Sequence, residues 1–143
     1  MPTLEEAIAL AAQAHRGQMD KAGQPYVLHL LRAMFRVETE QERIIAVLHD
    51  LVEDTSYTFD DLRALGYSAD ILEALDCVTR RPEETYEQFI DRAAANPLAR
   101  RVKLADLEDN MDIRRYATLT EHDLERLQRY LRAWQQLKAM VES

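Results

Sequence analysis

Four ionisable side chains lie close together near the middle of the chain, where the surrounding residues are apolar. His49 and Asp50 end the mostly apolar segment 44–50, and Glu53 and Asp54 follow within one helical turn. Burying unpaired charges is costly, and a divalent cation is the compensation that would hold a histidine and several carboxylates together. A His-Asp pair by itself is also compatible with a core histidine whose hydrogen bonds are satisfied. The group as a whole indicates a metal site.

Two further residues make the metal interpretation stronger. His29 precedes His49 by 20 residues, and Asp106, which lies in the largely apolar run 102–107, follows Asp50 by 56 residues. These separations fit ligands drawn from three helices of a bundle, which is how helical cores assemble metal sites. Two imidazoles and two carboxylates suit borderline metals such as Mn, Fe or Zn. We expect Mn²⁺, with Fe or Zn as alternatives.

The elements that must position these side chains are helices. Only three glycines and four prolines interrupt the 143 residues, and apolar residues recur mostly at spacings of three and four. The sequence therefore predicts an all-α bundle of about seven to eight helices. They are expected at about 3–17, 27–37, 39–52, 58–65, 68–79, 85–95, 97–115 and 120–140.

Several of these helices carry recognisable start signals. Thr3 with Glu6, and Thr39 with Glu42, have the spacing of capping boxes. Asn96 followed by Pro97 is typical of an N-cap and a first helical residue. In this arrangement the His-Asp pair lies on the helix 39–52, and the loops at 17–26 and 80–82 become candidate functional segments.

Composition limits the class of protein and its partners. The hydrophobic fraction is 47%, the charged fraction is 31%, and no apolar run approaches the roughly 20 residues of a membrane span. We expect one domain over 1–143, in the cytoplasm because the N-terminus reads as an amphipathic helix rather than a secretory signal. The net charge of −8 argues against broad attraction to nucleic acid or to an anionic membrane. Small phosphorylated molecules remain open as substrates.

Longer sequence words carry a resemblance to a known family. They are AHRGQ at 14–18, KAGQPY at 21–26, AVLHDLVEDT at 46–55 and VKLADLEDN at 102–110. Over about residues 5–115 these words resemble the hydrolase domain of the RelA/SpoT alarmone enzymes within the HD superfamily, especially the stand-alone small alarmone hydrolases such as the metazoan SpoT homologues. The resemblance implies an HD-domain helical bundle whose metal ligands are His29, His49, Asp50 and Asp106.

The same resemblance implies a reaction. Family members of this kind remove the 3′-pyrophosphate from ppGpp or pppGpp, usually with Mn²⁺, and the product is GDP or GTP. Glu53 and Asp54 match the family's catalytic pair, and Asn110 matches an asparagine that contacts substrate. The remaining candidates for substrate binding are basic or aromatic residues in or near the motif words, namely Lys21, Tyr26, Lys103 and Arg80.

Two departures from the family pattern keep the substrate open. Asp20 and Asp112 stand where alarmone hydrolases usually carry basic residues, whereas Leu30, in place of a proline, should matter little. The added negative charge motivates two alternatives: the same machinery acting on another phosphorylated nucleotide or dinucleotide such as NADPH, and a catalytically silent nucleotide-binding module. A homodimer also stays open, because apolar residues of the last helix either close the core or form a dimer face: Leu124, Leu127, Leu131, Trp134, Leu137 and Val141.

Overall fold

The computed structural model describes residues 1–142, and every regular element among them is helical. Outside the helices, an isolated β-bridge pairs Met19 with Pro25. The all-α prediction is confirmed. In chain order the elements are α1 (Leu4–Ala14), α2 (Val27–Phe35), α3 (Glu40–Leu48), α4 (Leu51–Asp54), α5 (Phe59–Ala64), α6 (Ala69–Cys77), α7 (Tyr86–Ala95), α8 (Pro97–Asn110), the 3₁₀ helix η1 (Ile113–Arg115) and α9 (Glu121–Glu142).

The helix starts follow the capping signals in the sequence. The Thr3 and Thr39 side chains each accept a hydrogen bond from the backbone N–H three residues on, and the glutamates of both capping boxes return the contact. At the start of α8, the Asn96 side chain accepts from the backbone N–H groups of Leu98 and Ala99. Gly66 follows α5 with a φ of 97°, a conformation that favours glycine.

The structure differs from the expected helices at two places that bear on function. The helix expected at 39–52 is broken, because α3 ends at Leu48 and α4 begins at Leu51. The imidazole of His49 donates to the backbone oxygen of Ala46 at 2.6 Å at this break. The helix expected at 97–115 ends at Asn110, and η1 follows. The Asp112 side chain accepts there from the backbone N–H of Arg114, a local contact that competes with helical hydrogen bonding.

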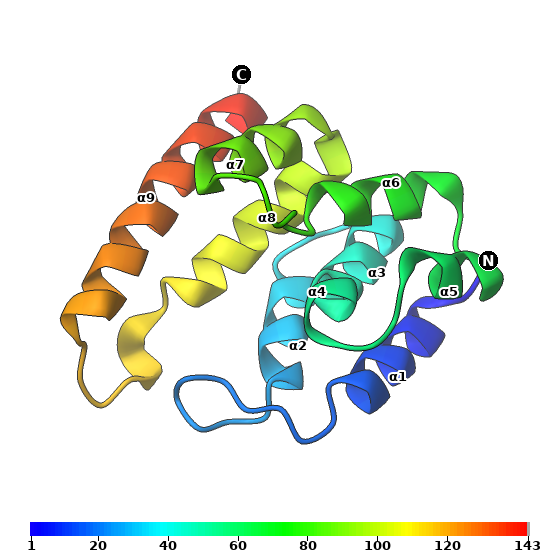
Figure 1. Ribbon diagram of the computed structural model, residues 1–143, viewed down its shortest axis with the longest axis horizontal. Helices are drawn as coiled ribbons and strands as arrows, with labels where there is room; N and C mark the ends of the chain where they lie inside the picture. The colour runs from blue at the N-terminus through cyan, green and yellow to red at the C-terminus, as the bar shows by residue number, and fades with distance from the viewer. Residues whose placement is uncertain (143) are drawn as a thin grey trace.

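Helix α3 lies at the centre of the larger of two hydrophobic clusters. Its residues 44–48 are all at most 1% exposed, and α1, α2, α6 and α8 pack against it. Helix α8 also packs against α7 and α9, so it lies between the two halves of the molecule, as Figure 1 shows. Both clusters therefore share α8, and its side chains Lys103, Asp106 and Asp109 are buried.

The smaller cluster joins α7, α8 and α9. Leu137 is fully buried in it, and Trp134 and Val141 pack against its edge. These residues of the last helix therefore close the core. Leu124 and Leu131 are 54% and 41% exposed and do not contribute to it. In the part of the chain that the structure describes, no helix is both long enough and apolar enough to cross a lipid bilayer.

Candidate metal and substrate site

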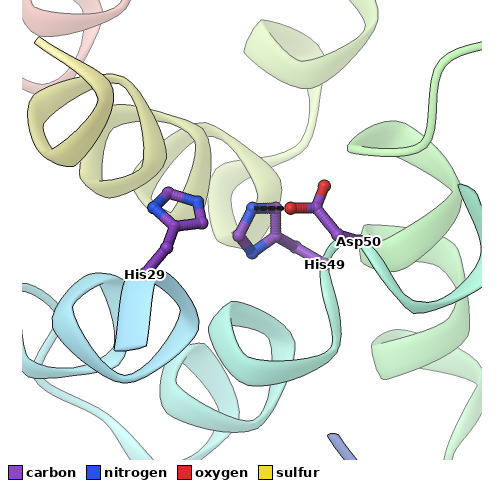
Figure 2. Close-up of side chains that lie close together, drawn as sticks. All are labelled: His29, His49 and Asp50. Carbon is purple, nitrogen blue, oxygen red and sulfur yellow. Dashed lines mark ion pairs between the residues drawn. The ribbon is translucent and has the colours of Figure 1, made fainter. Parts of the chain in front are cut away.

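The four predicted metal ligands lie together where α2, the end of α3 and α8 meet. The Oδ1 atom of Asp106 is 2.9 Å from Nε2 of His29 and 3.1 Å from Nε2 of His49. The Oδ2 atom of Asp50 is 3.2 Å from the same His49 nitrogen. Figure 2 shows the two neighbouring imidazole rings and the Asp50 carboxylate beside His49. Folding thus joins residues that are far apart in the sequence, and the break after α3 allows His49 and Asp50 to meet.

The Nδ1 atom of each imidazole has a hydrogen-bond partner on the side away from Asp106. Nδ1 of His49 donates to the backbone oxygen of Ala46 at 2.6 Å, and Nδ1 of His29 lies 2.7 Å from Oδ2 of Asp109. An acceptor at Nδ1 sets the ring orientation and leaves Nε2 available to a metal, as in many metalloproteins. Both rings therefore direct Nε2 toward the Asp106 carboxylate.

Asp106 is the buried centre of this cluster. Besides the two histidines, it accepts hydrogen bonds from the Lys103 ammonium at 2.8 Å and from the Asn110 side chain at 3.0 Å. Burial alone raises the pKa of Asp106, but the charges of Lys103 and His49 outweigh burial and hold this pKa well below its usual range. The Asp106 carboxylate is therefore ionised at neutral pH.

The acidic neighbours raise the pKa values of the two imidazoles. Burial lowers the pKa of His49, but Asp50 and Asp106 outweigh it, so this pKa lies well above its usual value. The pKa of His29 is also raised, because hydrogen bonds to Asp106 and Asp109 exceed the effect of burial. The carboxylates around the two imidazoles thus favour the protonated form of both rings.

The donor set fits a divalent cation. Two imidazole nitrogens and two carboxylates are ligands that Mn, Fe and Zn all accept. Donor atoms of His29, His49 and Asp50 lie within 4.8 Å of one another. When an ion forms bonds of about 2.1 Å, two adjacent ligand atoms are roughly 3 Å apart. The shortest distances between donor atoms in the cluster are close to this separation. A cation bound there would replace the imidazole protons as the positive charge between the carboxylates.

Tyr26 contacts the cluster from the loop before α2. Its hydroxyl donates a hydrogen bond to Oδ2 of Asp50, and its ring lies between those of His15 and His29 at centroid distances of 5.4 and 5.5 Å. Burial and the negative charge of Asp50 raise the pKa of Tyr26, so the hydroxyl stays protonated. Tyr26 therefore holds Asp50, and the substrate contact expected of it from the sequence stays a prediction.

Glu53 and Asp54 lie at the edge of the cluster, on the short helix α4. Donor atoms of Asp50, Glu53 and Asp54 come within 4.8 Å of one another. The Glu53 carboxylate accepts from the backbone N–H of Arg80 at 3.0 Å, and Gln18 donates to the backbone oxygen of Asp54 at 3.0 Å. Burial, followed by the charges of Asp50 and Glu53, raises the pKa of Asp54 to about 6. Asp54 is thus a stronger base than an ordinary carboxylate.

A cavity of about 490 Å³ opens beside the cluster, a volume in the range of small-molecule sites. Much of its outer wall comes from residues between Ile113 and Tyr130, and Met19 and Asp20 complete the lining. The predicted site residues that line it are Lys21, Tyr26, His29, Glu53, Asp54 and Asn110.

Two predicted substrate-binding residues lie outside this lining. The Lys103 ammonium contacts Asp106 and lies 4.8 Å from the centroid of the Phe89 ring. The Arg80 guanidinium lies 5.9 Å from the centroid of the Tyr86 ring, and the contribution of Arg80 to the site is its backbone N–H to Glu53. In this structure both residues hold acidic side chains of the site, and direct substrate contact by either stays a prediction.

Curated relatives share sequence with most of this chain. No protein-family model matches it. The GTP pyrophosphokinase of Streptomyces antibioticus is 34% identical in an alignment of length 125 that covers 79% of this chain and 15% of that protein. The guanosine-3′,5′-bis(diphosphate) 3′-pyrophosphohydrolase of Haemophilus influenzae is 32% identical in an alignment of length 117 that covers 71% of this chain and 17% of that protein. The chain thus spans 15 to 17% of the length of these two relatives.

A solved structure extends the similarity to the fold. It is that of a metazoan ortholog of SpoT that hydrolyses ppGpp, and it matches with a TM-score of 0.78 and 26% identity over 96% of this chain and 86% of that one. This chain has the HD-domain fold of the RelA/SpoT hydrolases. The chain is therefore similar to RelA/SpoT proteins both in sequence and in fold.

Sequence reasoning missed several side chains that complete this HD-domain site. Asp109 and Arg32 form a buried support behind His29, with Arg32 Nε donating to Asp109 Oδ1 at 2.7 Å. Each lies three residues from a predicted ligand, Asp106 or His29, a spacing that places side chains on one helix face and was available as a signal. Gln18 is part of the AHRGQ word, but its contact with the Asp54 backbone is a tertiary contact without a local signal.

The two acids that depart from the RelA/SpoT pattern differ in how they are paired. Oδ1 of Asp20 accepts from the backbone N–H groups of Ala22 and Gln24, both at 2.9 Å. Its Oδ2 lies 4.0 Å from Arg32 and makes no hydrogen bond, and Asp20 lines the cavity. Asp112 accepts two hydrogen bonds of 2.8 Å from the Arg114 guanidinium, which lowers the pKa of Asp112. Asp112 is therefore compensated by an arginine, whereas Asp20 keeps an unpaired oxygen beside the cavity.

Proposed function

We propose that this protein is a metal-dependent phosphohydrolase that removes the 3′-pyrophosphate from ppGpp or pppGpp, leaving GDP or GTP. The observation that carries the proposal is the cluster of His29, His49, Asp50 and Asp106, whose two Nε2 atoms face Asp106. The cluster borders a cavity that Glu53 and Asp54 also line. The names of the relatives and of the structural neighbour supply the substrate class.

The residues of the chain divide the work of this reaction. His29, His49, Asp50 and Asp106 would hold the ion, for which we propose Mn²⁺. A bound divalent cation would neutralise charge on the phosphoryl oxygens and lower the pKa of the attacking water. Glu53 and Asp54, which line the cavity beside the proposed ion, would orient this water and accept its proton. Asn110, which already donates to Asp106, lines the cavity and can contact the substrate.

The charges of the cavity lining bear on whether it can hold a highly phosphorylated substrate. Of the two acids that depart from the family pattern, Asp112 is paired with Arg114, and Asp20 accepts two backbone hydrogen bonds. The lining contains three cations, Lys21, Arg115 and Arg126, and four acids, Asp20, Glu53, Asp54 and Asp123. A bound divalent ion would therefore supply the additional positive charge that a polyphosphate needs. A cytoplasmic location and a homodimer stay predictions.

The first test is the release of pyrophosphate from ppGpp by the purified protein with added Mn²⁺. We expect robust release by the wild type and a loss of about 100-fold or more in Asp50→Ala, because an ion ligand is removed. The matched control is Asp60→Ala, whose side chain on α5 is 91% exposed and lies outside the cavity lining. Equal rates in Asp50→Ala and Asp60→Ala would contradict the proposed site.

A substrate panel separates the alternatives. Hydrolysis of NADPH or another phosphorylated nucleotide, without release of pyrophosphate from ppGpp, would support a hydrolase activity but contradict the proposal that an alarmone is the substrate. Glu53→Gln is expected to abolish turnover and to leave the Mn²⁺ content unchanged. A wild type that binds Mn²⁺ but hydrolyses no member of the panel would indicate a silent nucleotide-binding module instead.

A further inference from the structure

Arg115 has hydrogen-bond donors that the protein itself does not use. Its Nε and Nη1 atoms are buried and make no hydrogen bond. Nη1 lies 3.6 Å from Oδ1 of Asp109 and 3.9 Å from Oδ2 of Asp112, distances that give charge attraction without a hydrogen bond. Nη2 donates to the backbone oxygen of Asp109 over a long 3.5 Å. Because unpaired buried donors are costly, this guanidinium is suited to receive an acceptor from outside the chain.

The other cations near the site differ from Arg115. Arg126, which also lines the cavity, donates to Asp123 at 2.9 Å, and Lys21 is exposed at the cavity edge. Lys103 donates to Asp106 and lies outside the lining. Among the described residues that line this cavity, Arg115 is therefore the arginine with buried, unused donors.

The end of α8 explains why Arg115 faces the site. The chain leaves the helix after Asn110, and the Asp112 side chain stabilises the turn by accepting from the backbone N–H of Arg114. The Arg114 side chain is 86% exposed, whereas Arg115 turns back to Asp109. Since the other oxygen of Asp109 contacts His29, a single carboxylate links the Arg115 guanidinium to the expected metal ligands.

We propose that Arg115 binds a phosphate oxygen of the nucleotide substrate and contributes to the choice of that substrate. The inference rests on the proposed function, because it assigns a ligand to the same cavity. A guanidinium presents its N–H groups as a planar fork that matches two oxygens of a phosphate. The phosphate would satisfy Nε and Nη1, and Asp109 and Asp112 would keep the guanidinium in place.

The test measures binding without turnover. Inorganic pyrophosphate and GDP, neither of which carries a 3′-pyrophosphate, are titrated separately into the Mn²⁺-loaded protein by calorimetry. Arg115→Gln is expected to lower the affinity for one of the two ligands about 10- to 100-fold, because the variant loses a charge-assisted hydrogen bond. Arg115→Lys keeps the charge beside Asp109 and should fall between wild type and Arg115→Gln. Arg63→Gln, on α5, is the control because it makes the same change in net charge outside the cavity lining.

The two ligands and the control define the outcomes. Weaker pyrophosphate binding would place Arg115 at the leaving group, and weaker GDP binding would place it at the 5′-diphosphate. If Arg115 has only a structural role, Arg115→Gln will have a lower melting temperature or Mn²⁺ content, but its affinities for both ligands will equal those of Arg63→Gln. This result would overturn the inference. A wild type that binds neither ligand would overturn it too. Arg115-dependent binding in a protein that does not hydrolyse ppGpp would reject only the proposed function.

Discussion

Both carboxylate oxygens of Asp109 are engaged on the buried side of the site. Oδ2 lies 2.7 Å from Nδ1 of His29 and accepts from Nη2 of Arg32 at 3.2 Å, and Oδ1 accepts from Nε of Arg32 at 2.7 Å. Burial by itself raises the pKa of Asp109, but hydrogen bonds from His29 and Arg32 lower it to about 2. An ionised Asp109 thus fixes the His29 ring without itself being a candidate ligand.

Replacing Asp109 should therefore weaken the metal site. We expect Asp109→Asn to lower Mn²⁺ affinity about 10- to 100-fold, the usual effect of removing the acceptor behind a metal-binding histidine. Competition with a chelator of known affinity measures the change. Asp60→Asn, at an exposed position of α5, controls for the loss of one negative charge. Equal affinities in the two variants would show that Asp109 does not orient His29 for metal.

The raised pKa values of His29 and His49 predict that metal binding releases protons. In the metal-free protein both imidazoles hold a proton more firmly than usual, and Asp50 and Asp106 are already ionised because their pKa values are lowered. Mn²⁺ must displace the imidazole protons, so its affinity should fall as the pH falls. Calorimetry in buffers with different ionisation enthalpies measures the released protons. A binding enthalpy that is the same in all buffers would contradict this.

How far individual residues can be predicted depends on where their signal lies. His49, Asp50 and Asp106 are recognisable from the sequence because each is an ionisable residue in an apolar segment and in a family word, whereas His29 lies in an apolar helix outside those words. Their meeting in space agrees with that prediction, and their role as ligands stays a prediction. The support behind them comes from tertiary contacts across α2 and α8, which leave only weak traces in the sequence.

At the scale of elements, helix starts are predictable and interruptions are not. A capping box is a contact over three residues, so Thr39 and Glu42 announce α3 by themselves. The break between α3 and α4 occurs at His49 and Asp50, whose side chains contact Asp106 on α8 and Tyr26 in the loop before α2. Tertiary contacts of this kind cannot be seen in a local apolar pattern, which explains why one continuous helix is expected from the sequence.

An ion at this site would join three elements, α2, the end of α3 and α8, and should stabilise the fold. At Mn²⁺ about 100-fold above its Kd, binding would add about 2.7 kcal/mol to the free energy of unfolding. For a chain of this size that gain raises Tm by roughly 5 to 10 °C. Thermal unfolding with Mn²⁺ and with excess EDTA measures the shift, and Asp50→Ala should lose it. A shift of the same size in Asp50→Ala would place the stabilising ion elsewhere.

At the scale of the whole molecule, α8 joins the two hydrophobic clusters. The larger one surrounds α3, and the smaller one joins α7, α8 and α9. The shared helix α8 ties the two clusters together, and the single domain over 1–143 stays a prediction. The acidic net charge of −8 is a property of the whole chain, whereas the cavity lining combines three cations, Lys21, Arg115 and Arg126, with four acids.

This division has a consequence for how such a protein can change over evolution. The candidate ligands on α2 and α3 are anchored in the larger cluster, whereas Tyr130 on the facing wall of the cavity packs against the smaller one. Mutations in the segment 113–130 can therefore reshape the wall while the ion-binding half keeps its packing. A chain with this architecture can thus acquire a different cavity wall without rebuilding its cluster of candidate ligands.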